Sequence, residues 1–307
     1  MTSEKKQAPH WIYAALLIGA AAIWGMGTVV IKDTVQLLPP GWIVGIRFLC
    51  AGTVLFLVLL PRMMRTLDAD HLRAGALLGV LNGMAYLFNS TGLAYTTASK
   101  SSFLTAVYCV FMPFLAWTIL HKRPSVYNVS AAVICIMGVG LVSLPSTGAL
   151  SIGFGDAITL VSALFLGLHL AFTSKLAPGR DILVLTAVQF IVSGLIGLAW
   201  GAASEPWPTL QQFSPELLSN LAYLIIAASC IALLLQNIGL THVSPAPASL
   251  FLATESVFGV AFSVALLGET LSQQMVFGFM LIFFAIVVSE YFPTSKFIKK
   301  VLTKRKK

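Results

Sequence analysis

Long apolar stretches recur along the whole chain, separated by short polar or Gly/Pro-rich breaks such as LPPG at 38–41 and APGRD at 177–181. A helix needs about 20 mostly apolar residues to cross a bilayer, and most of these stretches are close to that length. The pattern therefore predicts an all-α membrane protein with ten transmembrane helices, at 12–31, 41–60, 72–90, 99–119, 128–144, 154–173, 182–203, 218–238, 247–267 and 273–292.

The first stretch follows a basic N-terminal segment, MTSEKKQAPHW, which is also how a secretory signal peptide begins. However, the apolar residues 12–31 form a longer run than the core of a typical signal peptide, and many similar runs follow. We therefore expect this segment to be retained as the first helix.

Composition agrees with this pattern and excludes a soluble domain. Of the 307 residues, 58% are hydrophobic and 10% are charged, whereas soluble domains carry about 25% charged residues. The four cysteines lie singly within apolar stretches, so we expect small core residues, with no disulfide framework, no metal site and no cofactor. These cysteines are Cys50, Cys109, Cys135 and Cys230.

Lysine and arginine alternate between the two predicted sides of the membrane. With ten helices both termini share one side, and 16 of the 19 Lys and Arg residues lie in the termini, in the loops of that side or, for Arg73, at the adjoining end of a helix. The opposite side holds Lys32 and Lys100, and Arg47 lies inside a helix. Because positive loops stay in the cytoplasm, both termini are expected to be cytoplasmic, in a multi-pass protein of the cell (inner) membrane.

The tail at 294–307 carries much of the net charge of +8 and follows the last helix directly. Its expected partner is the anionic headgroups of the lipid bilayer. No nucleic-acid-binding motif accompanies this charge, so no nucleic-acid partner is expected.

The chain also resembles itself. With a shift of 147 residues, 87–125 lies over 234–272 without gaps, with identities that include Gly92 with Gly239, and the predicted helix ends agree to within two residues. The two repeats are 1–147 and 148–293, with five helices each. Because five is odd, the second repeat enters the membrane from the other side. Such inverted repeats recur in secondary transporters, whose substrate site lies near the midplane between the halves.

The segment QNIGLTHVSPAPASLFLATESVFGVAFSVALLGETLS resembles the signature of EamA-type transporters in the drug/metabolite transporter superfamily. So do AAIWGMGTVVIK, PPGWIVGIRFL and GDAITLVSALFLGLHLAFTSKL, and the resemblance covers nearly the whole chain. It implies a ten-helix inverted-repeat fold and export of small metabolites, often amino acids, from bacteria. One departure is HKRPS at 121–125, where many members carry a motif like the Gly-Glu of the ninth helix, so the two motifs need not play symmetric roles.

Glu255 is a carboxylate near the middle of the ninth predicted helix, and the repeat places Tyr108 at the same level of the fourth. Ionisable groups inside a membrane are costly and normally mark function. Glu255 is therefore predicted to bind a substrate cation or to take up a coupling proton. The alternative is a hydrogen-bonded carboxyl that ties its helix to a neighbour.

Arg47 is the intramembrane positive charge, and three roles remain open for it. It could hold a substrate carboxylate bidentately, act as the fixed ion partner of Glu255, or snorkel to the membrane surface. If both charges line one cavity, they match the two ends of a zwitterion, which favours amino acids.

Other polar or aromatic residues lie deep in the predicted helices. Asn82, Tyr86 and Asn89 share one stripe of the third helix, which indicates either cavity lining or interhelical hydrogen bonding. Trp24 lies away from the interfacial belt and could offer a stacking surface. His169 could titrate near neutral pH or be a packing residue.

The sequence lacks the H-E-x-x-H, Walker and G-x-S-x-G motifs and paired intramembrane aspartates, so we do not expect an enzyme or an ATP-driven pump. A channel or a scaffold fits the single buried carboxylate poorly. We expect a secondary transporter that exports a small metabolite, with an amino acid as the favoured substrate, by alternating access. The alternative is a multidrug or organic-cation exporter. Proton coupling and a homodimer stay open. The predicted substrate-binding or coupling residues are Glu255, Arg47, Trp24, Asn82, Tyr86, Tyr108 and His169.

Overall fold

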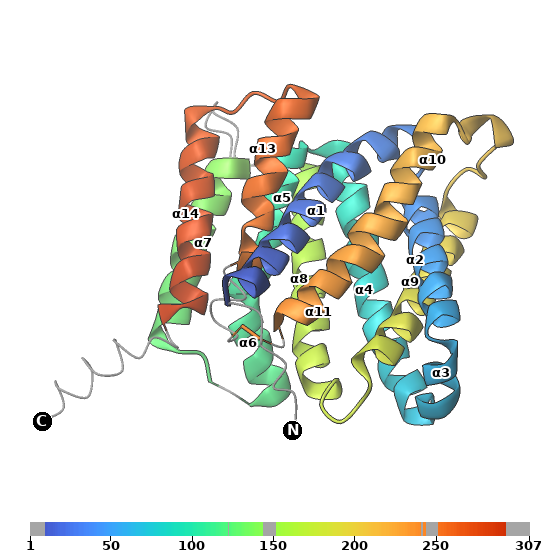
Figure 1. Ribbon diagram of the computed structural model, residues 1–307. Helices are drawn as coiled ribbons and strands as arrows, with labels where there is room; N and C mark the ends of the chain where they lie inside the picture. Colours follow the sequence, from blue (N-terminus) through green and yellow to red (C-terminus); the bar gives the residue numbers. More distant parts are fainter. Residues whose placement is uncertain (1–9, 122, 144–151, 241, 244–250, 293–307) are drawn as a thin grey trace, which may run out of the picture.

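The computed structural model describes residues 10–121, 123–143, 152–240, 242–243 and 251–292, and the regular structure in these ranges is helical (Figure 1). The elements are α1 (His10–Leu37), α2 (Pro40–Val58), α3 (Leu60–Thr66), α4 (Ala69–Tyr95), α5 (Ala98–Ala106), α6 (Tyr108–Leu120), α7 (Val126–Ser143), α8 (Phe154–Leu176), α9 (Ile182–Ser204), the 3-10 turn η1 (Leu210–Gln212), α10 (Pro215–Ala222), the π-helical segment η2 (Tyr223–Ile231), α11 (Ala232–Leu240), α13 (Glu255–Leu267) and α14 (Gln273–Glu290).

Each predicted membrane segment falls on one helix or on a run of consecutive helices, although residues 144 and 247–250 lie outside the described ranges. Within the described ranges, seven helical runs are long and apolar enough to cross a membrane, counting α5 with α6 and α10 with η2 and α11. Two shorter apolar helices cover 251–267 and 273–289. The remaining long helix, α4, carries the polar stripe. The all-helical prediction is confirmed, and the count of ten spans stays a prediction.

Local sequence explains where several of these helices begin. Pro40 occupies the first turn of α2, where its missing N–H costs no hydrogen bond. The carboxylate of Asp68 caps α4 by accepting the backbone N–H of His71 at 2.8 Å. Asp181 caps α9, and Ser272 caps α14, in the same way.

Two of the helices are interrupted at equivalent positions. The fourth predicted span breaks at Val107, so that Tyr108 begins α6. In the ninth, Thr254 precedes Glu255, which begins α13. The shift of 147 residues found in the sequence relates the two breaks residue by residue.

The far ends of the same two helices also correspond. His121 caps the C-terminus of α6 and Gly268 that of α13, and both residues have a left-handed backbone, with φ of 56° and 65°. Glycine adopts this conformation readily, whereas a histidine there is uncommon. The capping geometry is therefore the same where the sequences, HKRPS and GETLS, differ.

The helices pack in pairs that join the two halves of the chain: α2 on α9, α4 on α8, α1 on α11 and α13, and α7 on α14. Figure 1 shows the pair α7 and α14 at one edge of the bundle and α2 and α9 near the other. The α2–α9 contact is close because glycines face it. A Cβ built on Gly52 would lie 2.7 Å from the backbone N of Ile191, and one on Gly41 would lie 2.8 Å from the backbone N of Gly201.

The two ends of the bundle are joined differently. At the upper end of Figure 1, where α1 passes into α2, carboxylates from the second half hold helix N-termini of the first half. Glu205 accepts Gly41 N–H at 2.9 Å, and Glu269 accepts the N–H groups of Ala98 at 2.7 Å and Ser99 at 3.0 Å.

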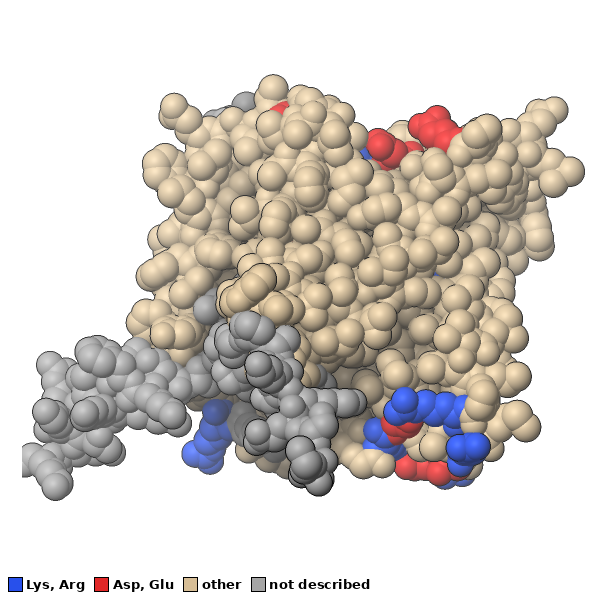
Figure 2. All heavy atoms as spheres, viewed as in Figure 1, with Lys and Arg blue, Asp and Glu red and all other residues tan. Residues whose placement is uncertain are grey.

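At the lower end, which holds α3 and the α8–α9 junction, the contacts between the halves are ion pairs (Figure 1). Arg62 pairs with Asp181, and Arg180 Nη2 lies 2.6 Å from Asp70 Oδ2. On the face shown in Figure 2, Lys and Arg atoms gather at this lower end, and the surface between the two ends is almost free of charge.

Candidate functional site

A cavity of about 170 Å³ lies among the helices of both halves. All seven predicted residues line it, so residues from α1, α2, α4, α6, α8 and α13 meet at one place. These residues are Trp24, Arg47, Asn82, Tyr86, Tyr108, His169 and Glu255.

Arg47 is held inside the bundle by aromatic rings. Its guanidinium carbon lies 4.7 Å from the centroid of the Tyr86 ring and 4.8 Å from that of Phe48. Its Nε donates to Ser229 Oγ at 3.0 Å. The residue is only 3% exposed, so the alternative in which Arg47 snorkels to the surface is wrong. Two ring faces stabilise the buried charge through cation–π attraction.

Glu255 is the first residue of α13 and directly follows the one-residue interruption at Thr254. Among the described residues, its carboxylate takes part in no hydrogen bond and no ion pair, including with Arg47. The interpretation as a carboxyl that ties its helix to a neighbour therefore has no contact to support it. The carboxylate is half-buried and lines the cavity.

The polar stripe on α4 both lines the cavity and forms hydrogen bonds to neighbouring helices. Asn82 Nδ2 donates to Ser193 Oγ at 3.0 Å, and Asn89 Nδ2 donates to Thr105 Oγ1 at 2.9 Å. All three stripe residues also line the cavity. The hydrogen bonds fix the amides in place, so this wall is preorganised.

His169 and Trp24 are also anchored. His169 Nε2 lies 3.2 Å from Gln189 Oε1, within hydrogen-bond distance. His169 is 9% exposed, and its Nδ1 has no partner in the described part of the protein. The indole Nε1 of Trp24 donates to the carbonyl of Ala228 at 2.8 Å, which leaves the ring as a lining surface.

Several lining residues were not predicted. Serine, threonine and phenylalanine are ordinary in membrane helices, so only the positions of Ser229 and Phe48 beside Arg47 reveal them. The further lining residues include Thr28, Phe48, Ser102, Thr105, Ser162, Phe190, Ser229 and Gln236.

Comparison with known proteins identifies the chain. A model described as the EamA-like transporter family matches residues 11–144 and, a second time, residues 153–291. The chain belongs to the EamA-like transporter family. The predicted family is thereby confirmed, and with it a multi-pass membrane transporter.

Similar curated proteins carry transporter names without a substrate. An uncharacterized transporter of Archaeoglobus fulgidus is 28% identical over 280 residues, which cover 90% of this chain and 85% of that protein. The uncharacterized inner membrane transporter YedA of Escherichia coli K12 is 26% identical over 278 residues, covering 87% and 86%. A solved crystal structure matches with a TM-score of 0.63 at 15% identity, over 92% of this chain and 99% of that one. That likeness concerns the fold alone.

Proposed function

We propose that this EamA-like transporter is a secondary transporter that exports an amino acid across the inner membrane by alternating access. The observation that carries the proposal is the presence of Arg47 and Glu255 in one cavity without an ion pair between them. Because neither charge neutralises the other by direct contact, both remain available to a ligand. A guanidinium suits a carboxylate and a carboxylate suits an ammonium, so the pair fits the two ends of a zwitterion.

The mechanism in this proposal is a rocking of the halves 1–147 and 148–293 about the cavity. It is supported by the double match of the family model and by the equivalent breaks before Tyr108 and Glu255. The helix packing also agrees with a repeat. In the first half α4 packs on α8 of the second half, and α1 packs on the run α10–α11 of the second half. The close α2–α9 contact would serve as the pivot.

The orientation in this proposal has both termini in the cytoplasm and the lower end of Figure 1 facing inward. Arg62 and Arg65 in α3, and Arg180 between α8 and α9, support it through the positive-inside rule. Residues 294–307 lie outside the described ranges, and their contact with anionic lipid stays a prediction. Glu255 is the group on which a coupling proton would be carried.

A multidrug or organic-cation exporter is the second candidate. The aromatic lining supports it, since Trp24, Phe48, Tyr86 and Phe190 surround the cavity and Glu255 could bind the cation. In that case Arg47 would repel the substrate, so its removal should be tolerated or even favourable. The two candidates therefore differ in what they require of Arg47.

The deciding experiment is counterflow in proteoliposomes loaded with a panel of unlabelled amino acids and organic cations. Saturable exchange of one amino-acid class, lost in both Glu255→Gln and Arg47→Gln, supports the proposal. Exchange of cations that survives Arg47→Gln supports the second candidate. Glu216→Gln and Arg65→Gln are matched controls, because both residues are exposed and lie outside the cavity.

A further inference from the structure

The segment 205–214, which joins α9 to α10 at the upper end of the bundle, presents two large apolar side chains on its outside. Trp207 is 69% exposed and Leu210 is 92% exposed. In Figure 1 the segment extends sideways beyond α2 and α9. Residues 206–214 contain no charged residue. Exposed apolar surface of this kind marks contact with a partner or a membrane.

Contacts with the start of α2 fix the position of this segment. Glu205 accepts the backbone N–H of Gly41 with both carboxylate oxygens, at 2.9 and 3.0 Å. Trp42 Nε1 donates to the carbonyl of Pro206 at 3.0 Å. The rings of Trp42 and Trp207 lie 4.8 Å apart. The outward position of Trp207 is therefore set by the fold.

The turn that carries Leu210 is fixed as well. Thr209 and Gln212 form a capping box, in which Gln212 Oε1 accepts the backbone N–H of Thr209 at 2.7 Å and the Thr209 side chain accepts that of Gln212. Trp207 has a proline on each side, and each proline restricts the backbone. The segment thus presents both apolar side chains from a defined backbone.

The exposed residues continue the outward surface of α9. Three glycines of α9 pack against α2, namely Gly194, Gly197 and Gly201. Leu195 and Trp200 of the same helix are exposed. Because α9 is long and apolar enough to cross a membrane, these exposed side chains face lipid. Trp207 and Leu210 follow them at the end of the same helix, where the headgroups begin.

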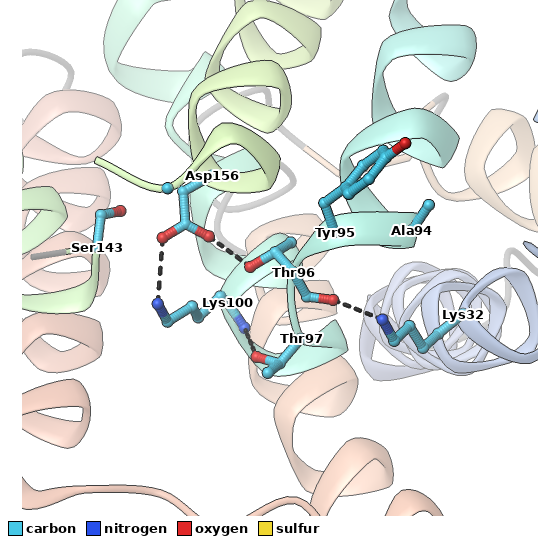
Figure 3. A pocket seen from close by; sticks show the side chains of 9 residues that line it. Lys32, Ala94, Tyr95, Thr96, Thr97, Lys100, Ser143 and Asp156 are labelled. Carbon is cyan, nitrogen blue, oxygen red and sulfur yellow. Dashed lines mark hydrogen bonds and ion pairs between the residues drawn. The ribbon is translucent and has the colours of Figure 1, made fainter. Parts of the chain in front are cut away.

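The charges at this end do not favour an anionic partner. Glu216 follows the segment, and Asp33 lies close enough to Glu216 for their like charges to interact. On the face shown in Figure 2, Asp and Glu atoms lie at the upper right. The positive charges of the pocket in Figure 3, at the same end, are engaged: Lys32 donates to two carbonyls, and Lys100 pairs with Asp156. The segment therefore suits neutral lipid better than anionic lipid.

We propose that residues 205–214 form an interfacial anchor, in which Trp207 and Leu210 enter the headgroup region of the leaflet at the upper end and contact neutral phospholipid. Tryptophan suits this depth because its ring is apolar and its N–H is polar. Leucine adds apolar area that is removed from water. The assignment goes beyond the proposed function, because it concerns a surface outside the central cavity and holds for any substrate.

The interfacial anchor would hold the α2–α9 pair at a fixed depth in the bilayer. α9 runs directly into the anchor, and Glu205 and Trp42 tie the anchor to the start of α2. If this pair is the pivot of alternating access, the pivot would be fastened to the lipid while other helices move. This consequence rests on the proposed function, whereas the anchor itself does not.

The test uses the full-length protein with its four native cysteines replaced by alanine. One new thiol, Leu210→Cys, carries the environment-sensitive fluorophore NBD, and the protein is reconstituted in phosphatidylcholine liposomes. Three quenchers are compared: aqueous iodide, phosphatidylcholine with a nitroxide on its headgroup, and phosphatidylcholine with a nitroxide deep in its acyl chain. Glu216→Cys is the control for an exposed polar position at the same end, and Leu195→Cys is the control for a lipid-facing position within α9.

We expect the headgroup nitroxide to quench the label at position 210 at least about twofold more strongly than the label at position 216, because the anchor lies at the depth of the interfacial aromatic belt. The deep nitroxide should quench most strongly at position 195. Trp207→Ser should lower the headgroup quenching at position 210, whereas Trp207→Phe, which keeps an aromatic ring, should retain most of it.

If position 210 is quenched by iodide as strongly as position 216 and by neither nitroxide lipid, the segment lies in water and the assignment is overturned. Protection from iodide and from both lipids would overturn it as well, because protein, such as a second copy of the chain, would then cover the segment. Nitroxide quenching that requires added phosphatidylglycerol would contradict the neutral partner, and unchanged quenching in Trp207→Ser would contradict the role of Trp207. None of these readouts requires transport, so failure here is distinguishable from failure of the proposed function.

Discussion

Tyr108 and Glu255 occupy the same place in two interrupted helices: each is the first residue after the break, and both line the central cavity. The repeat thus delivers an aromatic hydroxyl from one half and a carboxylate from the other. An exact duplication would have put two carboxylates or two phenols there. The divergence at this position contributes to the electrical asymmetry of the central cavity.

Glu255→Gln is expected to reduce counterflow by at least about tenfold, because hydrogen bonds to charged groups contribute about 1.5–3 kcal/mol. Glu255→Asp should retain part of the activity, since the charge is kept and the reach is shortened. Uptake of labelled substrate measures both. If Glu255→Gln matches Glu216→Gln, the carboxylate takes no part in binding or coupling.

The stabilising effect of the aromatic rings around Arg47 can be tested without changing Arg47 itself. Tyr86→Phe keeps the ring face and should lower thermal stability less than Tyr86→Leu, which should cost about 0.5–2 kcal/mol through the lost cation–π contact. Thermal unfolding of the detergent-solubilised protein measures the difference. Equal losses for the two variants would mean that the ring does not stabilise the guanidinium.

The α2–α9 contact should tolerate no added side chain. Gly52→Val forces a side chain against the backbone of Ile191, and overpacking of this kind typically costs about 1–3 kcal/mol. Gly153→Ala is the control, because a Cβ there meets nothing within 4 Å. The unfolding temperatures of both variants test the contact, and a stable Gly52→Val protein with normal counterflow would show that the helices can separate.

The Asp68 cap on α4 should give a pH dependence at the lower end. The pKa of Asp68 is lowered because its carboxylate accepts the backbone N–H of His71 and contacts the His71 ring. A lowered pKa stabilises the folded state above the unfolded value of about 3.9, and this contribution disappears as pH falls through the folded pKa. Asp68→Asn should therefore lower the unfolding temperature at neutral pH, and the difference from wild type should shrink below about pH 4. A difference that is constant with pH would contradict this.

Polar residues in apolar surroundings could be predicted as site residues because the membrane makes them conspicuous, and all of those chosen line one cavity. The two helix breaks could not, since the stretches AVY at 106–108 and ATE at 253–255 contain neither glycine nor proline to signal them. Nor could the π-helical winding of η2, which depends on packing. Ser229 lies in that segment, and its hydrogen bond with Arg47 could not be predicted because the two residues are far apart in the sequence.

The different contacts at the two ends of the bundle have a consequence for how the surroundings act on the carrier. The ion pairs of the lower end include exposed partners, and dissolved salt screens such pairs. The upper end is held by carboxylates bonded to backbone N–H groups in partly buried positions, which salt affects much less. Raising the ionic strength should therefore weaken the contacts between the halves at the lower end and leave those at the upper end nearly unchanged. Under the proposed alternating-access mechanism, the salt concentration at the lower end would shift the balance between the conformations open to the two sides of the membrane.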